Sequence, residues 1–218
     1  VSLAAVGTLS VLLAAQAPPQ DEIAARARKI HQDAIVIDTH IDTTGRLLMP
    51  GWHFLDRHSP PPPGPRAGGR PAFNHVDLPR MREGGLDAAF FSIFISGEIT
   101  GQQAIRRALE QIDAVRQLAA RHPDEIVLAT SAADVRAAHK AGKVAALMGV
   151  EGGHMIDDTL AALRAYASLG VRYLSLTHSV NTGWADSSGG EPKHNGLSYF
   201  GRDVVREMNG LGMMVDVS

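Results

Sequence analysis

Histidine and acidic side chains stand at the ends of three apolar stretches of the sequence. His40 and Asp42 close the first stretch, Glu151 ends the second, and His178 follows the third. Residues two apart in an extended strand point to the same face, so His40 and Asp42 form an imidazole–carboxylate pair on one side of a strand. Such a pair supplies part of the ligand set of a divalent metal ion. The three stretches therefore indicate metal chemistry.

The burial expected for the two carboxylates strengthens this interpretation. A buried carboxylate without a partner costs several kcal/mol, and the strand residues next to Asp42 and Glu151 include no lysine or arginine. Each residue also has a simpler explanation. The His-x-Asp pattern is common by chance, Glu151 could cap a helix or pair with an arginine, and His178 could be a hydrogen-bonded buried histidine. Three separate strand ends would each need such an explanation, which favours the metal.

The elements that must position these residues alternate along the chain. Apolar runs predict strands at residues 34–38, 87–95, 126–129, 143–150, 171–177 and 212–218. Amphipathic spacing predicts helices at residues 21–31, 101–121, 132–141, from 157 or 158 to 169, and 199–211. The first run is a compact apolar stretch, which is typical of a strand buried on both faces. Residues 50–71 are rich in proline and glycine and predict an excursion on the surface.

The alternating order predicts an α/β fold with a parallel sheet and helical crossovers. Five main strands are too few to close an eightfold barrel, and the length by itself fits an open doubly wound sheet better. The polar residues at the carboxyl ends of three strands favour the barrel instead, because ligands collect at that edge. The last predicted strand stops at Ser218, so we expect the sequence to be part of a longer protein.

Composition narrows the partners and the compartment. The 218 residues carry a net charge of −2 and contain no cysteine, so nucleic acid is not an expected partner and any metal must be held by His, Asp or Glu. Residues 1–17 are uncharged and resemble the apolar core and cleavage region of a secretory signal, although a disordered apolar segment is the alternative. We expect a signal-peptide remnant at 1–20, no transmembrane span, and an exported protein, periplasmic or otherwise extracytoplasmic.

Five blocks of the sequence, in order, resemble the membrane (renal) dipeptidase family of the metal-dependent hydrolases. They are residues 36–42 (VIDTHID), 75–85 (HVDLPRMREGG), 149–154 (GVEGGH), 169–186 and 196–218. The resemblance implies a TIM-like (β/α)8 barrel truncated after about the fifth main strand, with residues 21–218 forming part of the catalytic domain. Thr39 and Ile41 depart from the pattern of better-known members, without changing the ligand positions.

The resemblance also implies two zinc ions and assigns roles to four residues. His40 and Asp42 match ligands of one zinc ion, and Glu151 matches the carboxylate that bridges both. His178 matches the histidine that contacts the substrate and stabilises the oxyanion, so His178 and Glu151 are the expected catalytic residues. The remaining ligands and the proton shuttle are expected beyond Ser218. By itself the sequence is therefore expected to be inactive.

The reaction implied is hydrolysis of unblocked dipeptides by a zinc-bridging hydroxide, with a D-residue tolerated on the carboxyl side. A homodimer is left open. Two other functions also stay open: another metal-dependent amidohydrolase on the same barrel, such as a deacetylase or lactonase, and a non-catalytic metal-binding relative.

Overall fold

A computed structural model describes residues 20–59 and 75–218. The predicted signal remnant, apart from residue 20, and most of the proline-rich stretch lie outside the described residues. The chain divides into two units, residues 1–34 and 35–218. The first unit contains α1 (Gln20–Asp33), which confirms the helix predicted at 21–31 and buries none of its residues.

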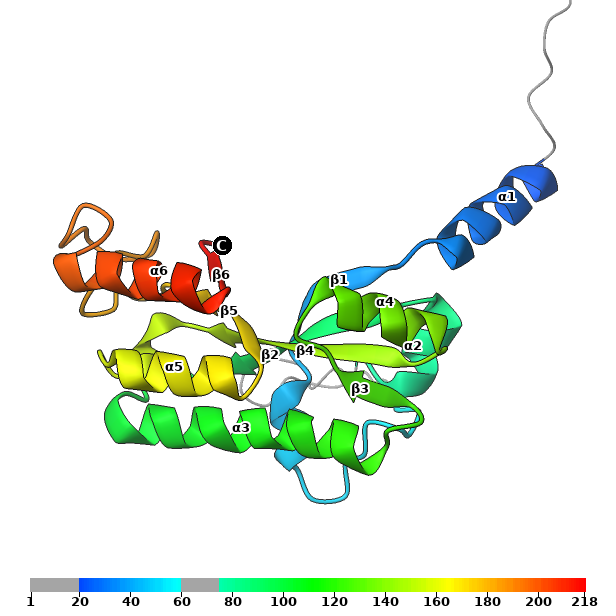
Figure 1. Ribbon diagram of the computed structural model, residues 1–218, viewed down its shortest axis with the longest axis horizontal. Helices are drawn as coiled ribbons and strands as arrows, with labels where there is room; N and C mark the ends of the chain where they lie inside the picture. The colour runs from blue at the N-terminus through cyan, green and yellow to red at the C-terminus, as the bar shows by residue number, and fades with distance from the viewer. Residues whose placement is uncertain (1–19, 60–74) are drawn as a thin grey trace, which may run out of the picture. The chain divides into compact units, whose positions relative to one another are not determined.

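The second unit holds the sheet and its helices (Figure 1). The strands are β1 (Ile37–Ile41), β2 (Ala88–Phe94), β3 (Ile126–Leu128), β4 (Val144–Glu151), β5 (Val171–Ser175) and β6 (Met214–Asp216). The α-helices are α2 (Leu78–Gly84), α3 (Gly101–Arg121), α4 (Ala132–Lys140), α5 (Leu160–Ser168) and α6 (Tyr199–Leu211), with short 3-10 helices η1 (Thr44–Leu48) and η2 (Gly153–Ile156).

The strands pair in the order β1-β2-β4-β5-β6, and every pairing between these named strands is parallel. β2 follows one edge of β4 along its whole length, so β3 and β5 share the other edge, with β3 beside the start of β4 and β5 beside its end. This arrangement confirms the predicted parallel α/β fold. It also brings the carboxyl ends of β1, β2, β4 and β5 to one edge of the sheet.

Alternate strand residues pack against helices on opposite faces of the sheet. On one face, Phe91, Met148 and Leu174 are fully buried in the same cluster as residues of α3 and α5. On the other face, Phe90 and Leu147 pack with residues of α4 in a smaller cluster. Figure 1 shows α3 and α5 on one side of the strands and α4 on the other.

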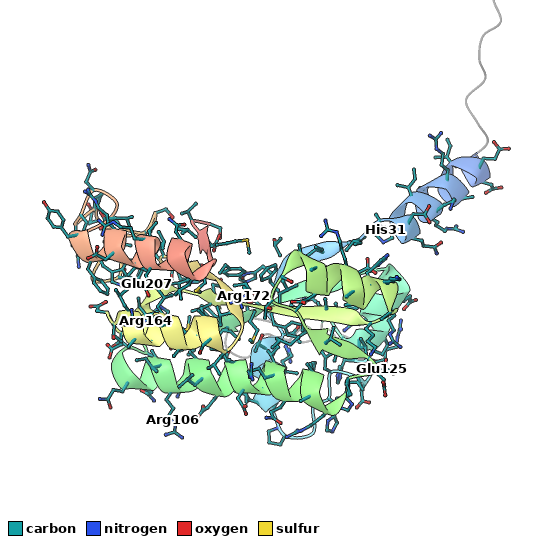
Figure 2. The ribbon with its side chains drawn as sticks, in the orientation of Figure 1. His31, Arg106, Glu125, Arg164, Arg172 and Glu207 are labelled. Carbon is teal, nitrogen blue, oxygen red and sulfur yellow. The ribbon has the colours of Figure 1, made fainter. Side chains whose placement is uncertain are left out.

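The helix α6 is attached to this layer through α5. Arg164 of α5 and Glu207 of α6 form an ion pair with a nitrogen–oxygen distance of 3.0 Å, and both are labelled in Figure 2. The guanidinium of Arg172, at the start of β5, donates hydrogen bonds to the backbone carbonyls of Thr130, Ala167 and Val171. These contacts hold the second half of the sheet to its helices.

The prediction for the first strand is wrong in both position and burial. The strand runs over Ile37–Ile41 rather than 34–38, and its first four residues are exposed. β1 pairs with β2 alone within the described residues, so it is an edge strand, and apolar letters by themselves do not distinguish an edge from a central strand.

Two smaller predictions are also corrected. Phe54 lies within the predicted surface excursion, yet it is 1% exposed and packs against Phe91 with ring centroids 5.4 Å apart, because the loop folds back onto the sheet. The helix predicted from 157 or 158 begins at Leu160. Asp157 and Asp158 adopt left-handed backbone angles, and Thr159 caps the helix instead.

Residues 20–59 and 75–218 contain no helix that is both long and apolar enough to cross a membrane. The longest described helix, α3, has 21 residues and is amphipathic, with one face buried against the sheet.

The helix α2, which the sequence analysis does not predict, begins at a buried carboxylate. Asp77 is 0% exposed and accepts hydrogen bonds from the backbone N–H groups of His58 and Arg80 and from the Arg80 guanidinium. Burial raises the pKa of Asp77, but these hydrogen bonds outweigh it and hold the pKa below its ordinary value. The carboxylate ties the loop before α2 to the first turn of the helix.

We expect Asp77→Ala to lower the free energy of unfolding by about 2–4 kcal/mol at pH 7, because a helix cap and a buried charge-assisted pair are both lost. Asp113→Ala, at an exposed position of α3, is the control and should change it by less than about 0.5 kcal/mol. Urea unfolding measures both. Because the folded pKa is lowered, the wild-type advantage should be present above about pH 4 and shrink as the pH falls through the folded value; equal losses in the two variants would contradict this.

Candidate metal centre

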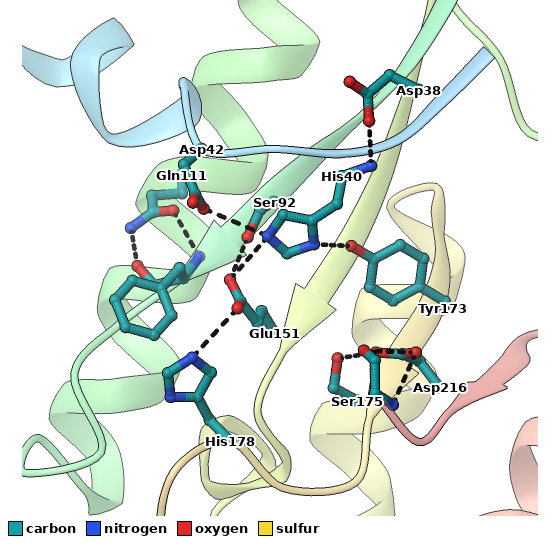
Figure 3. A network of polar contacts seen from close by, with 12 residues as sticks. Asp38, His40, Asp42, Ser92, Gln111, Glu151, Tyr173, Ser175, His178 and Asp216 are labelled. Carbon is teal, nitrogen blue, oxygen red and sulfur yellow. Dashed lines mark hydrogen bonds and ion pairs between the residues drawn. The ribbon is translucent and has the colours of Figure 1, made fainter. Parts of the chain in front are cut away.

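The predicted site residues meet at the carboxyl edge of the sheet (Figure 3). His40 belongs to β1, Asp42 follows its last residue, Glu151 ends β4, and His178 lies shortly after β5. In a parallel sheet these positions share one edge, so residues distant in the sequence come together there.

Three of the four residues form a compact donor cluster. The Nε2 atom of His40 lies 3.3 Å from Oδ1 of Asp42 and 3.2 Å from Oε2 of Glu151. One ligand atom from each of the three residues lies within 4.8 Å of the other two. Imidazole and carboxylate donors this close together match the chemistry of a divalent metal site.

The carboxylate of Glu151 connects this cluster to His178. Its Oε1 atom lies 3.2 Å from Nε2 of His178, and its Oε2 atom accepts a hydrogen bond of 2.7 Å from the hydroxyl of Ser92. The Glu151 side chain is 18% exposed. Figure 3 shows the carboxylate between the two imidazoles, with one oxygen toward each.

The expected burial of Asp42 is wrong. Its side chain is 74% exposed, four times the exposure of Glu151. Asp42 lies just beyond the end of an edge strand, where no neighbouring strand of the described residues covers it. The desolvation argument for a cation therefore applies to Glu151 alone, and Asp42 contributes by its position beside His40.

Two further residues touch the cluster and are absent from the sequence analysis. Tyr173 of β5 places its hydroxyl 3.0 Å from Nδ1 of His40, and burial together with nearby carboxylates raises its pKa well above the ordinary value. Ser92, which binds Glu151, is the one polar residue of β2. A hydroxyl within an otherwise apolar strand is a signal that could have identified Ser92 from the sequence.

A buried glutamine holds the end of β2 beside His178. The side-chain amide of Gln111 on α3 accepts from the backbone N–H of Phe94 and donates to its carbonyl. The Phe94 ring then packs against the His178 imidazole, with centroids 4.9 Å apart. Gln111 thus holds the end of β2 in place, and Phe94 supports the histidine.

A cavity of about 330 Å³ opens over these residues. Its volume falls at the lower end of the range for small-molecule sites. It is lined by Asp42, Gly45, Ser92, Phe94, Gln111, Glu151 and His178.

The backbone directly after Glu151 passes through two glycines, at positions where a larger residue would be strained or would clash. Gly152 has a φ of +125°, and a Cβ on Gly153 would lie 2.3 Å from the carbonyl oxygen of Leu176. His154, next in the chain, points its Nε2 atom to the carbonyl of Ile95 at 3.1 Å, and burial lowers its pKa. His154 therefore joins two loops and lies outside the donor cluster.

The loop that follows His178 is organised by one carboxylate. Asp186 accepts hydrogen bonds from the backbone N–H groups of Lys193, His194 and Gly196. The N–H of Gly196 is the largest cause that lowers the Asp186 pKa, to about 2. Trp184, two residues earlier, is 1% exposed and packs near Phe200 of α6.

Fold and site together define a parallel α/β protein with a candidate metal centre at the carboxyl ends of its strands. A model of the membrane dipeptidase family (peptidase family M19) matches residues 24–218. The chain belongs to this family of metallo-dipeptidases.

This chain matches only part of the length of its curated relatives. Dipeptidase 3 of Macaca fascicularis is 44% identical over 153 residues, which cover 67% of this chain and 30% of the relative. Dipeptidase aclJ of Aspergillus oryzae is 40% identical over 155 residues, which cover 67% of this chain and 37% of the relative. The matched region thus spans about a third of these two proteins.

Solved structures share the fold over most of the chain. The probable dipeptidase PvdM of Pseudomonas aeruginosa has a TM-score of 0.72 at 23% identity and covers 92% of this chain and 50% of that one, which shows the fold alone. A metallopeptidase of Rhodobacter sphaeroides, solved with a phosphinate mimic of the dipeptide L-Ala-D-Ala, has a TM-score of 0.68 at 27% identity, with 84% and 57% covered. These matches confirm the predicted partial barrel.

We expect Asp186→Asn to loosen the loop after His178, because an amide group offers one acceptor oxygen in place of two to the three N–H groups. Hydrogen exchange at Lys193, His194 and Gly196 should become faster, while Glu191→Gln, an exposed change in the same loop, should leave it unchanged. In the wild type, protection of these amides should be present above about pH 4 and decline toward pH 2, because the folded pKa is lowered. Unchanged exchange in Asp186→Asn would contradict the role of the carboxylate.

Proposed function

We propose that the complete protein is a zinc-dependent dipeptidase and that this chain supplies one side of a two-zinc centre. The observation that carries the proposal is the cluster of His40, Asp42 and Glu151, whose ligand atoms lie within 4.8 Å of one another. Membership of the membrane dipeptidase family supports both the metal dependence and the dipeptide substrate.

The donor set fits zinc in its chemistry. Zinc is bound by imidazole nitrogen and carboxylate oxygen, and its catalytic sites use three protein ligands of these types. His40 and Asp42 would hold one ion together with Glu151. The two oxygens of Glu151 face different histidines, which supports a bridging role for this carboxylate.

When bound, zinc supplies Lewis acidity and makes a water nucleophilic at neutral pH. The chain's own residues orient the groups on this side of the site. Ser92 donates a hydrogen bond to Oε2 of Glu151 and helps to orient the carboxylate. Glu151 in turn holds the His178 imidazole through Nε2.

His178 is placed to stabilise negative charge on a substrate oxygen. Its imidazole lines the cavity and is supported on one side by Phe94. This geometry supports the assignment of His178 as the residue that receives the carbonyl oxygen.

The size of the cavity supports a small substrate. A volume of about 330 Å³ has room for a dipeptide. The mimic of L-Ala-D-Ala bound to the Rhodobacter sphaeroides relative supports the inclusion of a D-residue on the carboxyl side of the substrate. The proposed reaction is therefore hydrolysis of one peptide bond in unblocked L,L- and L,D-dipeptides.

We expect the complete protein to hydrolyse unblocked dipeptides, to lose activity on treatment with a chelator, and to regain it with Zn²⁺. Glu151→Gln should lower kcat/KM by more than about 100-fold, since loss of an outer-shell group alone costs about 10- to 100-fold. Glu191→Gln, an exposed change far along the loop, is the matched control and should retain activity.

A substrate panel of free dipeptides, N-acyl amino acids and lactones tests the proposal against its rivals. Turnover of acyl-amines or lactones with no cleavage of any free dipeptide would replace it with a different amidohydrolase. Metal binding without turnover of any substrate would replace it with a non-catalytic role.

A further inference from the structure

Tyr173 reaches across the sheet to the imidazole of His40. It belongs to β5, whereas His40 belongs to β1, and β4 and β2 lie between them. The Tyr173 ring is 6% exposed and packs against Phe90, with centroids 5.2 Å apart. Its hydroxyl lies 3.0 Å from Nδ1 of His40. Figure 3 draws this contact as a dashed line between the two side chains.

A missing side chain on β4 makes this reach possible. Gly149 is the register partner of Tyr173, and a Cβ at Gly149 would lie 1.9 Å from Cζ of the tyrosine. Any other residue at this position would occupy the space of the ring. The ring therefore lies directly over the β4 backbone and carries its hydroxyl to the neighbourhood of β1.

The His40 ring needs such a contact because packing alone does not fix it. Its side chain is 37% exposed. A neutral imidazole carries its proton on one of two nitrogens, and the partner of one nitrogen decides which one is free to bind a metal. The hydroxyl at Nδ1 leaves Nε2 facing Asp42 and Glu151.

We propose that Tyr173 is the positioning residue of His40, holding the imidazole in the orientation and tautomer that present the Nε2 lone pair to a metal ion. In that tautomer Nδ1 carries the proton, and the Nδ1–H group donates a hydrogen bond to the phenolic oxygen of Tyr173. The inference rests on the proposed metal site and adds a residue that acts through His40 without touching the ion. Groups that orient metal-binding histidines raise affinity through geometry.

The test compares Zn²⁺ affinities of the complete metal-free protein by competition with a chromogenic chelator. Tyr173→Phe removes one oxygen and keeps the ring above Gly149, so the fold should survive; far-UV circular dichroism and thermal unfolding of the metal-free variant check this. The dissociation constant for Zn²⁺ should rise about 10- to 100-fold. Tyr199→Phe removes a hydroxyl from a side chain that is 87% exposed and should leave the constant unchanged.

A second measurement reads the tautomer directly. The ¹⁵N chemical shifts of the His40 ring in the zinc-loaded wild type should report a protonated Nδ1, and in the metal-free Tyr173→Phe protein this tautomer should lose population relative to the metal-free wild type. A role confined to packing would not move these shifts. Equal Zn²⁺ affinities for wild type and Tyr173→Phe, with His40→Ala weakened, would overturn the role of Tyr173 alone. Equal affinities for wild type and His40→Ala would overturn the metal site and this inference together.

Discussion

The partly desolvated carboxylate of Glu151 is the constraint on which the arrangement of the site depends. With 18% of its side chain exposed, it needs protein partners for most of its hydrogen-bonding capacity. These partners come from three places: Ser92 in β2, His40 in β1, and His178 after β5. The strand order β1-β2-β4-β5 is thus the condition for a hydrogen-bonded carboxylate, and the site is as well defined as the sheet.

The register of β2 against β4 shows how closely this condition is met. Seven consecutive pairs run without a shift, and Ser92 stands opposite Gly149, two residues before Glu151 on the same face. A slip of one residue would turn Ser92 toward α3 and bring an apolar side chain to the carboxylate. Gly149 has no side chain, and the Tyr173 ring from β5 occupies the place where one would be. Gly149 therefore pairs with Ser92 on β2 and makes room for the Tyr173 ring from β5.

The sequence predicts the central elements well and the edge poorly. The bounds of α3 agree with the prediction, and those of β2 and β4 lie within one residue of it, because long periodic runs bounded by capping residues leave few alternatives. The convergence of His40, Asp42 and Glu151 follows from the rule that parallel strands share a carboxyl edge. β1 is displaced because an apolar run does not reveal how many neighbours it has. The Tyr173 contact depends on strand order and on a missing side chain on the neighbouring strand, neither of which local spacing encodes.

The geometry also changes the reason for expecting an ion. In the sequence analysis, the expected burial of two unpaired carboxylates favours a cation. In the structure Asp42 is largely hydrated, and Glu151 lies beside a hydroxyl and two imidazoles, so the fold tolerates both charges without one. The metal is indicated instead by ligand atoms from separate elements that lie within 4.8 Å of one another. Ser92 and Tyr173 contact the residues that carry these atoms. Because the donors are already assembled, binding requires little rearrangement, and more of the interaction energy is retained as affinity.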